Sequence, residues 1–332
     1  MKNIRRGKKM RIYKLLAFLI SLSVLLVPLT SLKKEPAEEN LTKNNAQTDG
    51  QTAPVKLQTV KVYITKTQET VEIELEEYLL GVLAAEMPAT YHEEALKAQA
   101  VAAYTYLLNK RKNPDEALGG ADLSDNSATH QGYLTATARN EKWGDKTEAY
   151  EKKLKKSVQE VMGKVIVYEG EPIIAAFHAI NSGVTQSAKT VWGGEVPYLK
   201  SVNSVGDRLS PDCVKTVAIS STEFSNLASN IDSCTLDGEA ESWIGDIETS
   251  SDGYVKTVEI GSAELTGLEA RDALGLRSAV FTYEYKDDNF MFTTSGYGHC
   301  VGMSQYGADY MARQGSTWEE IIKHYYTGVT VE

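Results

Sequence analysis

Apolar and polar residues alternate through residues 60–75, and the apolar spacing then becomes helical. The first stretch, VKVYITKTQETVEIEL, is rich in β-branched side chains, which predicts a hairpin or strand pair. Residues 75–86 repeat apolar positions at helical intervals and carry acidic residues at their start, where carboxylates suit a helix N-terminus. Pro88 disfavours helix at Met87, so we expect this helix to end with Glu86 in its last turn.

Glu86 shares one face of this predicted helix with apolar residues, namely Leu75, Leu79, Val82 and Leu83. Apolar neighbours and the negative end of the helix dipole both disfavour an ionised carboxylate. A carboxyl group that stays protonated can serve as a general acid. The pattern also fits a buried glutamate bonded to a neighbouring backbone group, and the local sequence leaves both interpretations open.

The following residues predict further helices and strands. Thr90 and Glu93 have the spacing of a capping box, which predicts a second helix that runs to about Lys110. A polar loop at residues 122–133 follows it. Beyond this loop we expect a helix near 145–162, strands at 165–167 and 173–178, and a last helix at 317–326.

Residues 203–285 differ from their surroundings in sequence pattern. They contain strand patterns such as YVKTVEIGS and a helix-like stretch at 265–274. They suggest a smaller α+β subdomain inserted into the main one. The expected fold class is therefore α+β, with the helical segment that carries Glu86 packed on antiparallel strands.

The first 32 residues form a basic start followed by an uncharged apolar run, LLAFLISLSVLLVPLTSL, at residues 15–32. This run can just span a bilayer, and its basic flank predicts that residues 1–14 stay in the cytoplasm and the rest of the chain outside. A cleaved signal peptide is the alternative, but no A-x-A-like site follows the run. We favour an uncleaved anchor at 1–32, a flexible polar linker at 33–58 and a folded domain at 59–332.

The composition changes this picture little. With 332 residues, 42% of them hydrophobic, and a net charge of -10, the chain is globular, and its acidic balance argues against nucleic acid as a partner. Export permits a disulfide, and Cys213–Cys234 is the expected pair, with Cys300 left over. The wide cysteine spacing gives no zinc signature, so neither a metal nor another cofactor is predicted.

Three long segments resemble, in order, the hallmarks of the stage II sporulation protein D family. They read LLGVLAAEMPATYHEEALKAQAVAAYTY at residues 79–106, FHAINSGVTQSAKTVWGGEVPYLKSV at 177–202 and GYGHCVGMSQYGA at 296–308. LGLRS at 274–278 also fits the family, and the resemblance covers residues 60–330. Several long matches in one order are far more specific than a single short motif.

This resemblance implies a lytic transglycosylase that cleaves the β-1,4 bond between N-acetylmuramic acid (MurNAc) and N-acetylglucosamine (GlcNAc) in peptidoglycan. The family's sporulation member is anchored in the mother-cell membrane, faces the septal wall, and acts in forespore engulfment together with stage II sporulation proteins M and P. The anchor, linker and external domain expected from the sequence agree with that setting.

The family's catalytic glutamate corresponds to Glu86, in the AAEMP match. A glycosidase that uses water generally needs two carboxylates, whereas a lytic transglycosylase uses the C6 hydroxyl of the muramic acid as nucleophile. Glu86 would protonate the leaving oxygen and then accept the C6 hydroxyl proton, which gives a 1,6-anhydro end. Asp122, Asp125 and Glu195 are candidates for a second carboxylate, and the sequence marks none of them.

The resemblance also implies residues that contact the glycan, although each has a purely structural alternative. Tyr104 stands where many members have arginine, and Lys200 corresponds to a lysine that the family needs for function. Some relatives have cysteines in the loop that corresponds to Ser127–Gln131 and bind zinc there. This chain has no cysteine in that loop, so zinc is not expected. Cys300, where relatives have glycine or another small residue, is expected to be buried. The full set of candidate substrate contacts is Tyr104, His130, Gln131, Tyr133, His178, Ser182, Lys200, His299 and Gln305.

A non-enzymatic function remains an alternative, because the same family includes an enhancer of an N-acetylmuramoyl-L-alanine amidase that acts as a wall-binding module. A zinc peptidase is a weaker alternative, because the sequence has no H-E-x-x-H motif. The sequence leaves open the oligomeric state and whether stem peptides must first be removed. It also leaves open whether Tyr104 replaces the family arginine.

Overall fold

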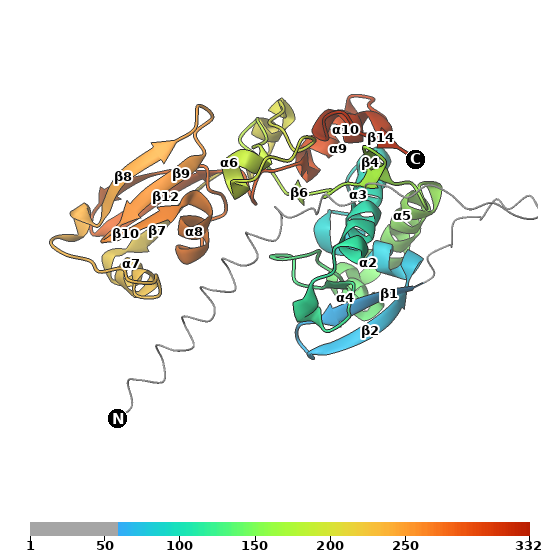
Figure 1. The fold of residues 1–332 in the computed structure, drawn as a ribbon, viewed down its shortest axis with the longest axis horizontal. Helices are drawn as coiled ribbons and strands as arrows, with labels where there is room; N and C mark the ends of the chain where they lie inside the picture. The colour runs from blue at the N-terminus through green and yellow to red at the C-terminus, as the bar shows by residue number, and fades with distance from the viewer. Residues whose placement is uncertain (1–58) are drawn as a thin grey trace, which may run out of the picture. The chain divides into compact units, whose positions relative to one another are not determined.

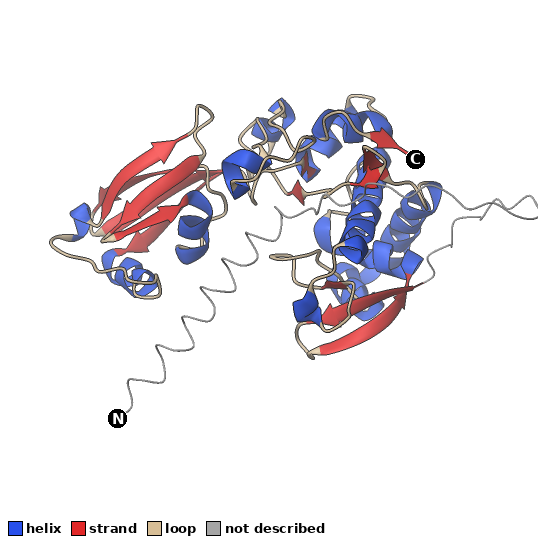
Figure 2. Ribbon diagram, in the orientation of Figure 1, coloured by secondary structure: helices blue, strands red, loops and turns tan. Residues whose placement is uncertain are grey.

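The computed structural model describes residues 59–332, so the anchor and linker expected at residues 1–58 lie outside the described residues. Within 59–332, no helix combines the length and the apolar character needed to span a bilayer. The described elements are helices and mainly antiparallel strands, which confirms the α+β class (Figures 1 and 2).

The first sheet begins with the expected hairpin. β1 (Thr59–Ile64) pairs antiparallel with β2 (Glu69–Glu74), and β3 (Leu123–Ser124) adds a short parallel strand on the other side of β1. Val60 and Val62 of β1 are fully buried, whereas β2 is mostly exposed, as suits an edge strand. β2 leads directly into α2 (Leu75–Glu86), which ends at Glu86 as predicted.

The helices pack into one large hydrophobic core. α2 and α5 (Thr147–Glu160) flank α3 (Glu93–Lys112), and α9 (Gln305–Arg313) and α10 (Trp318–Tyr325) pack on α3 from the C-terminal part of the chain (Figure 1). α4 (Ala136–Trp143) packs against α5. The apolar face of α2 is buried here, including Leu79, Val82 and Leu83.

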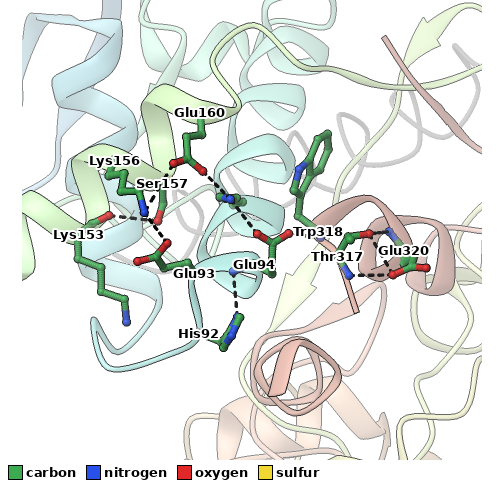
Figure 3. Close-up of polar contacts among 11 residues, drawn as sticks. His92, Glu93, Glu94, Lys153, Lys156, Ser157, Glu160, Thr317, Trp318 and Glu320 are labelled. Atoms are coloured by element: carbon green, nitrogen blue, oxygen red, sulfur yellow. Dashed lines mark hydrogen bonds and ion pairs between the residues drawn. The ribbon is translucent and has the colours of Figure 1, made fainter. Parts of the chain in front are cut away.

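The start of α3 corrects the predicted capping box. The helix begins at Glu93, and its N-cap is His92, whose Nδ1 accepts the N–H of Glu94 at 3.3 Å. Thr90 instead lies in the turn before the helix, and Glu93 pairs with Lys156 of α5 at 2.9 Å rather than reaching back (Figure 3). Glu94 accepts the backbone N–H of Trp318 at 2.8 Å, so the acidic first turn joins α3 to α5 and α10.

Two other predicted elements were only partly right. The helix expected at 145–162 is a 3-10 turn, η2 (Gly144–Lys146), followed by α5, and α4 before it was not predicted. The strand expected at 173–178 was mostly wrong, because only β6 (Phe177–His178) is extended, and it pairs in parallel with β13 (Met303–Ser304). β4 (Ile166–Tyr168) matches expectation and joins β5 (Glu171–Pro172) and β14 (Thr330–Val331) in a sheet.

A second hydrophobic core is built on two three-stranded sheets. β7 (Val214–Ser220), β11 (Phe281–Lys286) and β12 (Asn289–Ser295) form one sheet, in the order β11-β12-β7. β8 (Ile244–Thr249), β9 (Val255–Ile260) and β10 (Ala263–Thr266) form the other. α7 (Ser221–Ala228) and α8 (Gly267–Ala273) pack on them, and the core holds the stacked pair Phe224–Phe290 at 4.2 Å between ring centroids. The subdomain boundaries 203–285 stay a prediction, although β12 continues the sheet to Ser295.

Short helices complete the described chain; they are η1 (Glu116–Leu118), α6 (Ala188–Trp192), η3 (Val205–Leu209) and η4 (Ala240–Ser242).

The three cysteines are free thiols, so the expected Cys213–Cys234 disulfide is not formed. The two side chains belong to different neighbourhoods: Cys213 Sγ contacts the carbonyl of Asn181, and Cys234 Sγ contacts that of Ile260 in the second core. Cys300 is buried, as expected, with a left-handed backbone at φ 64°. That conformation favours glycine, which gives a physical reason for the small residue that the resemblance implied there.

Candidate functional site

Glu86 lies in a pocket of about 640 Å³ that collects residues from distant parts of the chain. The pocket walls come from the end of α2, the loop 127–131, the segment 174–179, α8, and the segment 297–299. Tyr106, Trp192 and Gln305 complete the lining.

Two hydrogen bonds hold the Glu86 carboxyl group. The backbone N–H of Gly132 donates to Oε1 at 2.6 Å, and the side-chain amide of Gln305 donates to Oε2 at 3.5 Å. Burial raises the pKa of Glu86, while the Gly132 and Gln305 donors and the charge of Lys142 pull that pKa back down. Glu86 therefore accepts a backbone N–H, as one of the two interpretations expected. It also lines the pocket, and its role as a general acid stays a prediction.

The approach of the 127–133 loop to Glu86 depends on Gly132. A Cβ at this position would lie 3.0 Å from Glu86 Oε1 and 3.2 Å from the Ala85 Cβ. Gln131 holds the loop in place, because its buried side-chain Nε2 lies 3.3 Å from both the Ala103 carbonyl and the Tyr78 hydroxyl. Gln131 lines the pocket and also positions the Gly132 N–H.

His130 and Tyr106 form the wall beside this loop. His130 Nδ1 lies 3.0 Å from the Ser124 hydroxyl, and burial lowers the pKa of the ring, with a further contribution from Lys110. The Tyr106 hydroxyl donates to the Thr129 carbonyl at 3.4 Å. Tyr106 was not among the predicted contacts, whereas Tyr104, which was, packs against the main core outside the lining. The two side chains differ because residues two apart point roughly 200° apart around a helix.

His178 and His299 form another wall, with 5.9 Å between their ring centroids. His178 Nδ1 lies 3.1 Å from the Val301 carbonyl, so it carries the ring proton, and Nε2 accepts from Asn181 at 3.3 Å. His299 Nδ1 accepts the N–H of Val301 at 3.0 Å. Burial lowers the pKa of His178 to about 3 and that of His299 to about 4, so both rings are neutral at physiological pH.

Three further predicted contacts lie outside the lining. Tyr133 packs over Gly81 and stacks on Tyr78, with 6.0 Å between centroids. The Ser182 carbonyl accepts from Arg208 at 3.0 Å, and the Lys200 side chain is exposed to solvent. Of the predicted set, the pocket brings together His130, Gln131, His178, His299 and Gln305 with Glu86.

The three candidate second carboxylates lie elsewhere in the structure. Asp122 pairs with Arg111 at 2.6 Å, Asp125 accepts the Thr65 N–H at 2.9 Å, and Glu195 is 79% exposed beside Lys189. None of the three lines the pocket. Besides Glu86, the described lining holds one carboxylate, Asp272 of α8, whose side chain is 74% exposed.

Sequence reasoning missed the exposed aromatic residues of the pocket. Trp192 is 44% exposed and Tyr297 is 46% exposed, which is unusual for such large apolar groups. Both lie within the segments that carry the family resemblance, but the sequence did not distinguish them from core residues. Arg271 and Asp272 were missed too, because they come from the inserted region rather than from a motif.

Comparisons with known proteins show the family of this chain. Residues 63–168, which include α2, α3 and the loop around Gly132, match the family described as Stage II sporulation protein. The chain is similar to stage II sporulation protein D of Bacillus subtilis (strain 168), with 38% identity over 275 residues that cover 82% of this chain and 78% of the relative. The stage II sporulation protein D of Bacillus amyloliquefaciens is 37% identical over 278 residues, with the same coverage.

A differently named relative is the amidase enhancer of Bacillus subtilis (strain 168), which is 31% identical over 305 residues, 76% of this chain and 40% of that protein. The class defined by these matches is that of sporulation proteins. Within it, the chain belongs to the stage II sporulation protein D family.

Proposed function

We propose that the protein is a lytic transglycosylase that cleaves the MurNAc–GlcNAc β-1,4 bond of peptidoglycan, with Glu86 as its acid and base. The observation that carries this proposal is the Glu86 carboxyl group, which has a raised pKa, faces the pocket and is held by the Gly132 N–H. Burial favours the protonated form that a general acid needs, and the Gly132 bond stabilises the carboxylate left after proton transfer.

The reaction needs one group to act twice. Protonated Glu86 gives its proton to the glycosidic oxygen as the bond from that oxygen to C1 of MurNAc breaks. The resulting carboxylate then takes the proton of the C6 hydroxyl while O6 bonds to C1. Glu86 ends protonated, no water is consumed, and the product carries a 1,6-anhydro ring.

The described lining holds no second sheltered carboxylate beside Glu86, which favours this chemistry over hydrolysis. Hydrolytic glycosidases generally place a second carboxylate across the bond from the acid. Here the other carboxylate of the described lining, Asp272, is largely in solvent and paired with Arg271 at 3.7 Å. The exposed ring of Trp192 offers an apolar face on which a sugar ring can stack, whereas the Arg277 guanidinium lies 4.6 Å from the centroid of the Tyr297 ring.

The test is product analysis by mass spectrometry, with the full chain purified in detergent and incubated with glycan strands. We expect 1,6-anhydro-MurNAc ends from the wild type, and a loss of roughly 10²–10⁴-fold in rate for Glu86→Gln. Glu195→Gln, a matched change at an exposed carboxylate outside the pocket, should leave the rate unchanged. Reducing ends in place of anhydro ends would show a hydrolase instead.

A second candidate is a wall-binding protein that stimulates an amidase. The similarity to a relative named amidase enhancer favours it. Glycan binding without any product, together with a faster amidase reaction when the chain is added, would support this function over the transglycosylase.

We also propose a cellular setting: septal wall removal and engulfment at the mother-cell membrane, with the folded domain on the wall side and stage II sporulation proteins M and P as partners. Its support is the basic and apolar sequence of residues 1–32 and the family membership. Co-purification of the tagged chain with those two proteins from sporulating cells tests the partners. Protease accessibility of residues 59–332 in protoplasts tests the topology.

A further inference from the structure

Arg271 reaches the Glu86 pocket from the second core. Its helix α8 starts with a capping box of Thr266 and Glu269, and Leu268, Arg271 and Asp272 of this helix line the pocket. Backbone bonds fasten the segment after α8 to the part of the pocket lining that contains Gly298: the N–H of Gly298 donates to the Arg277 carbonyl at 2.9 Å, and Ser278 forms a bridge with Gly298. Arg271 is thus part of a fixed wall.

The hydrogen-bonding capacity of Arg271 is largely unused. Its side chain is 24% exposed, its Nε is buried without a partner, and its one ion pair is a 3.7 Å contact with the neighbouring Asp272. A 3.7 Å pair with a carboxylate that is 74% exposed contributes little. Buried guanidinium groups are normally paired, because an unpaired buried charge is costly.

Other sheltered arginines of the described chain behave differently. Arg139 is 2% exposed and bonds to Glu77, Glu151 and the Leu134 carbonyl. Arg111 bonds to both oxygens of Asp122 and to the Thr59 carbonyl. Arg271 therefore differs from them, because most of its guanidinium N–H groups have no hydrogen-bond acceptor among the described residues.

Arg271 also sets the charge of the pocket. The described lining holds two carboxylates, Glu86 and Asp272, and three histidines whose pKa values are all lowered. Arg271 contributes, after burial, to the lowered pKa of His299, so its charge acts at the pocket wall. Among the described lining residues it is the one permanent cation.

We propose that Arg271 binds a carboxylate carried by the muramic acid unit of the glycan strand and thereby fixes the register of that strand at Glu86. A guanidinium fork matches a carboxylate with two parallel hydrogen bonds. Only every second sugar of the strand carries a lactyl ether, which ends in a free carboxylate or in a stem peptide with carboxylates of its own. A cation that recognises this group distinguishes the two kinds of β-1,4 bond.

This inference rests on the proposed function, and a binding assay separates the two. The full chain with Glu86→Gln, which should not cut, is titrated with a GlcNAc–MurNAc tetrasaccharide, the same sugar with its lactyl carboxyls amidated, a peptide-bearing form, and neutral chitotetraose. Adding Arg271→Gln should weaken tetrasaccharide binding by about tenfold or more and leave chitotetraose binding unchanged. Arg271→Lys, which keeps the charge but loses the fork, should fall between.

The remaining arms identify the source of the carboxylate. Loss of affinity on amidation points to the lactyl group, whereas an effect of Arg271→Gln confined to the peptide-bearing form points to the peptide. Lys215→Gln, which removes an exposed charge outside the pocket, controls for net charge. Far-UV circular dichroism checks that each variant folds.

Two results would overturn the role of Arg271: unchanged affinity of Arg271→Gln for every muramyl sugar, or an equal loss for chitotetraose. Binding of none of the four sugars by the parent chain would instead reject the proposed glycan site as a whole.

Discussion

The Gly132 N–H donates to the Glu86 carboxylate from 46 residues further along the chain, at 2.6 Å. This bond joins the end of a helix to an irregular loop, so the acid has a fixed orientation although it lies at a helix terminus. The loop is itself held by the buried amide of Gln131. The site thus depends on a backbone donor that no side-chain comparison would reveal.

Gly132→Ala should lower the cleavage rate about tenfold without a large change in stability. The added methyl group would lie 3.0 Å from Glu86 Oε1, so either the loop or the carboxyl group must shift by a few tenths of an ångström. Small misplacements of a catalytic group are costly to rate. Gly194→Ala, where nothing lies within 4 Å of the added carbon, is the matched control. Equal rates for both variants would contradict the positioning role of Gly132.

The cleavage rate should fall as pH rises through the Glu86 pKa, because the protonated acid starts the reaction. Gln305 donates to the Glu86 carboxylate and so lowers its pKa. Gln305→Met removes that donor, which raises the pKa and should move the falling limb to higher pH. A pH–rate profile of kcat/KM for both proteins measures the shift. A limb that stays in place or moves to lower pH would disprove the coupling.

His178 should make the fold sensitive to acid. Its pKa is lowered from 6.5 to about 3 by burial, so the unfolded chain binds a proton between these values while the folded chain does not. The stability contributed by the neutral ring is therefore present above the unfolded pKa and is lost as pH falls towards 3. Urea unfolding of His178→Gln across this window should show a flatter dependence on pH. An unchanged slope would mean that the ring is protonated in the folded state.

Trp192→Ala should weaken glycan binding about tenfold and hardly change the melting temperature. Its ring is 44% exposed, so little core packing is lost, while one face for a sugar is removed. Val205→Ala, a change at a 61% exposed apolar residue outside the pocket, should alter neither property. Isothermal titration with a GlcNAc–MurNAc tetrasaccharide and thermal unfolding measure the two effects.

The position of Glu86 could be predicted from the sequence because it depends on local features, whereas its role as an acid stays a prediction. Helical spacing and Pro88 were enough to place it in the last turn of α2. The remaining site could not be derived in this way. The Gly132 donor lies in a loop whose apolar residues do not recur at regular intervals. Arg271 comes from a region that reaches the pocket through contacts between residues far apart in the sequence.

Tyr104 and Tyr106 show why the sequence could not predict which single residues line the pocket. Both belong to the same matched segment, and only the orientation of α3 about its axis decides which one lines the pocket. The Cys213–Cys234 prediction failed for a related reason: the two residues are close in sequence, but Cys213 contacts the Asn181 carbonyl and Cys234 contacts the Ile260 carbonyl in the second core.

Gln305 contacts Glu86 across 219 residues, and this separation has a consequence for synthesis. Chains are made from the N-terminus, so a nascent chain completed only to residue 300 already contains Glu86, the loop around Gly132 and the whole second core. It lacks Gln305 together with α9 and α10, which pack on α3. The candidate site is therefore complete only after α9 and α10 have been made, and a chain that stops before Gln305 would carry Glu86 without this partner.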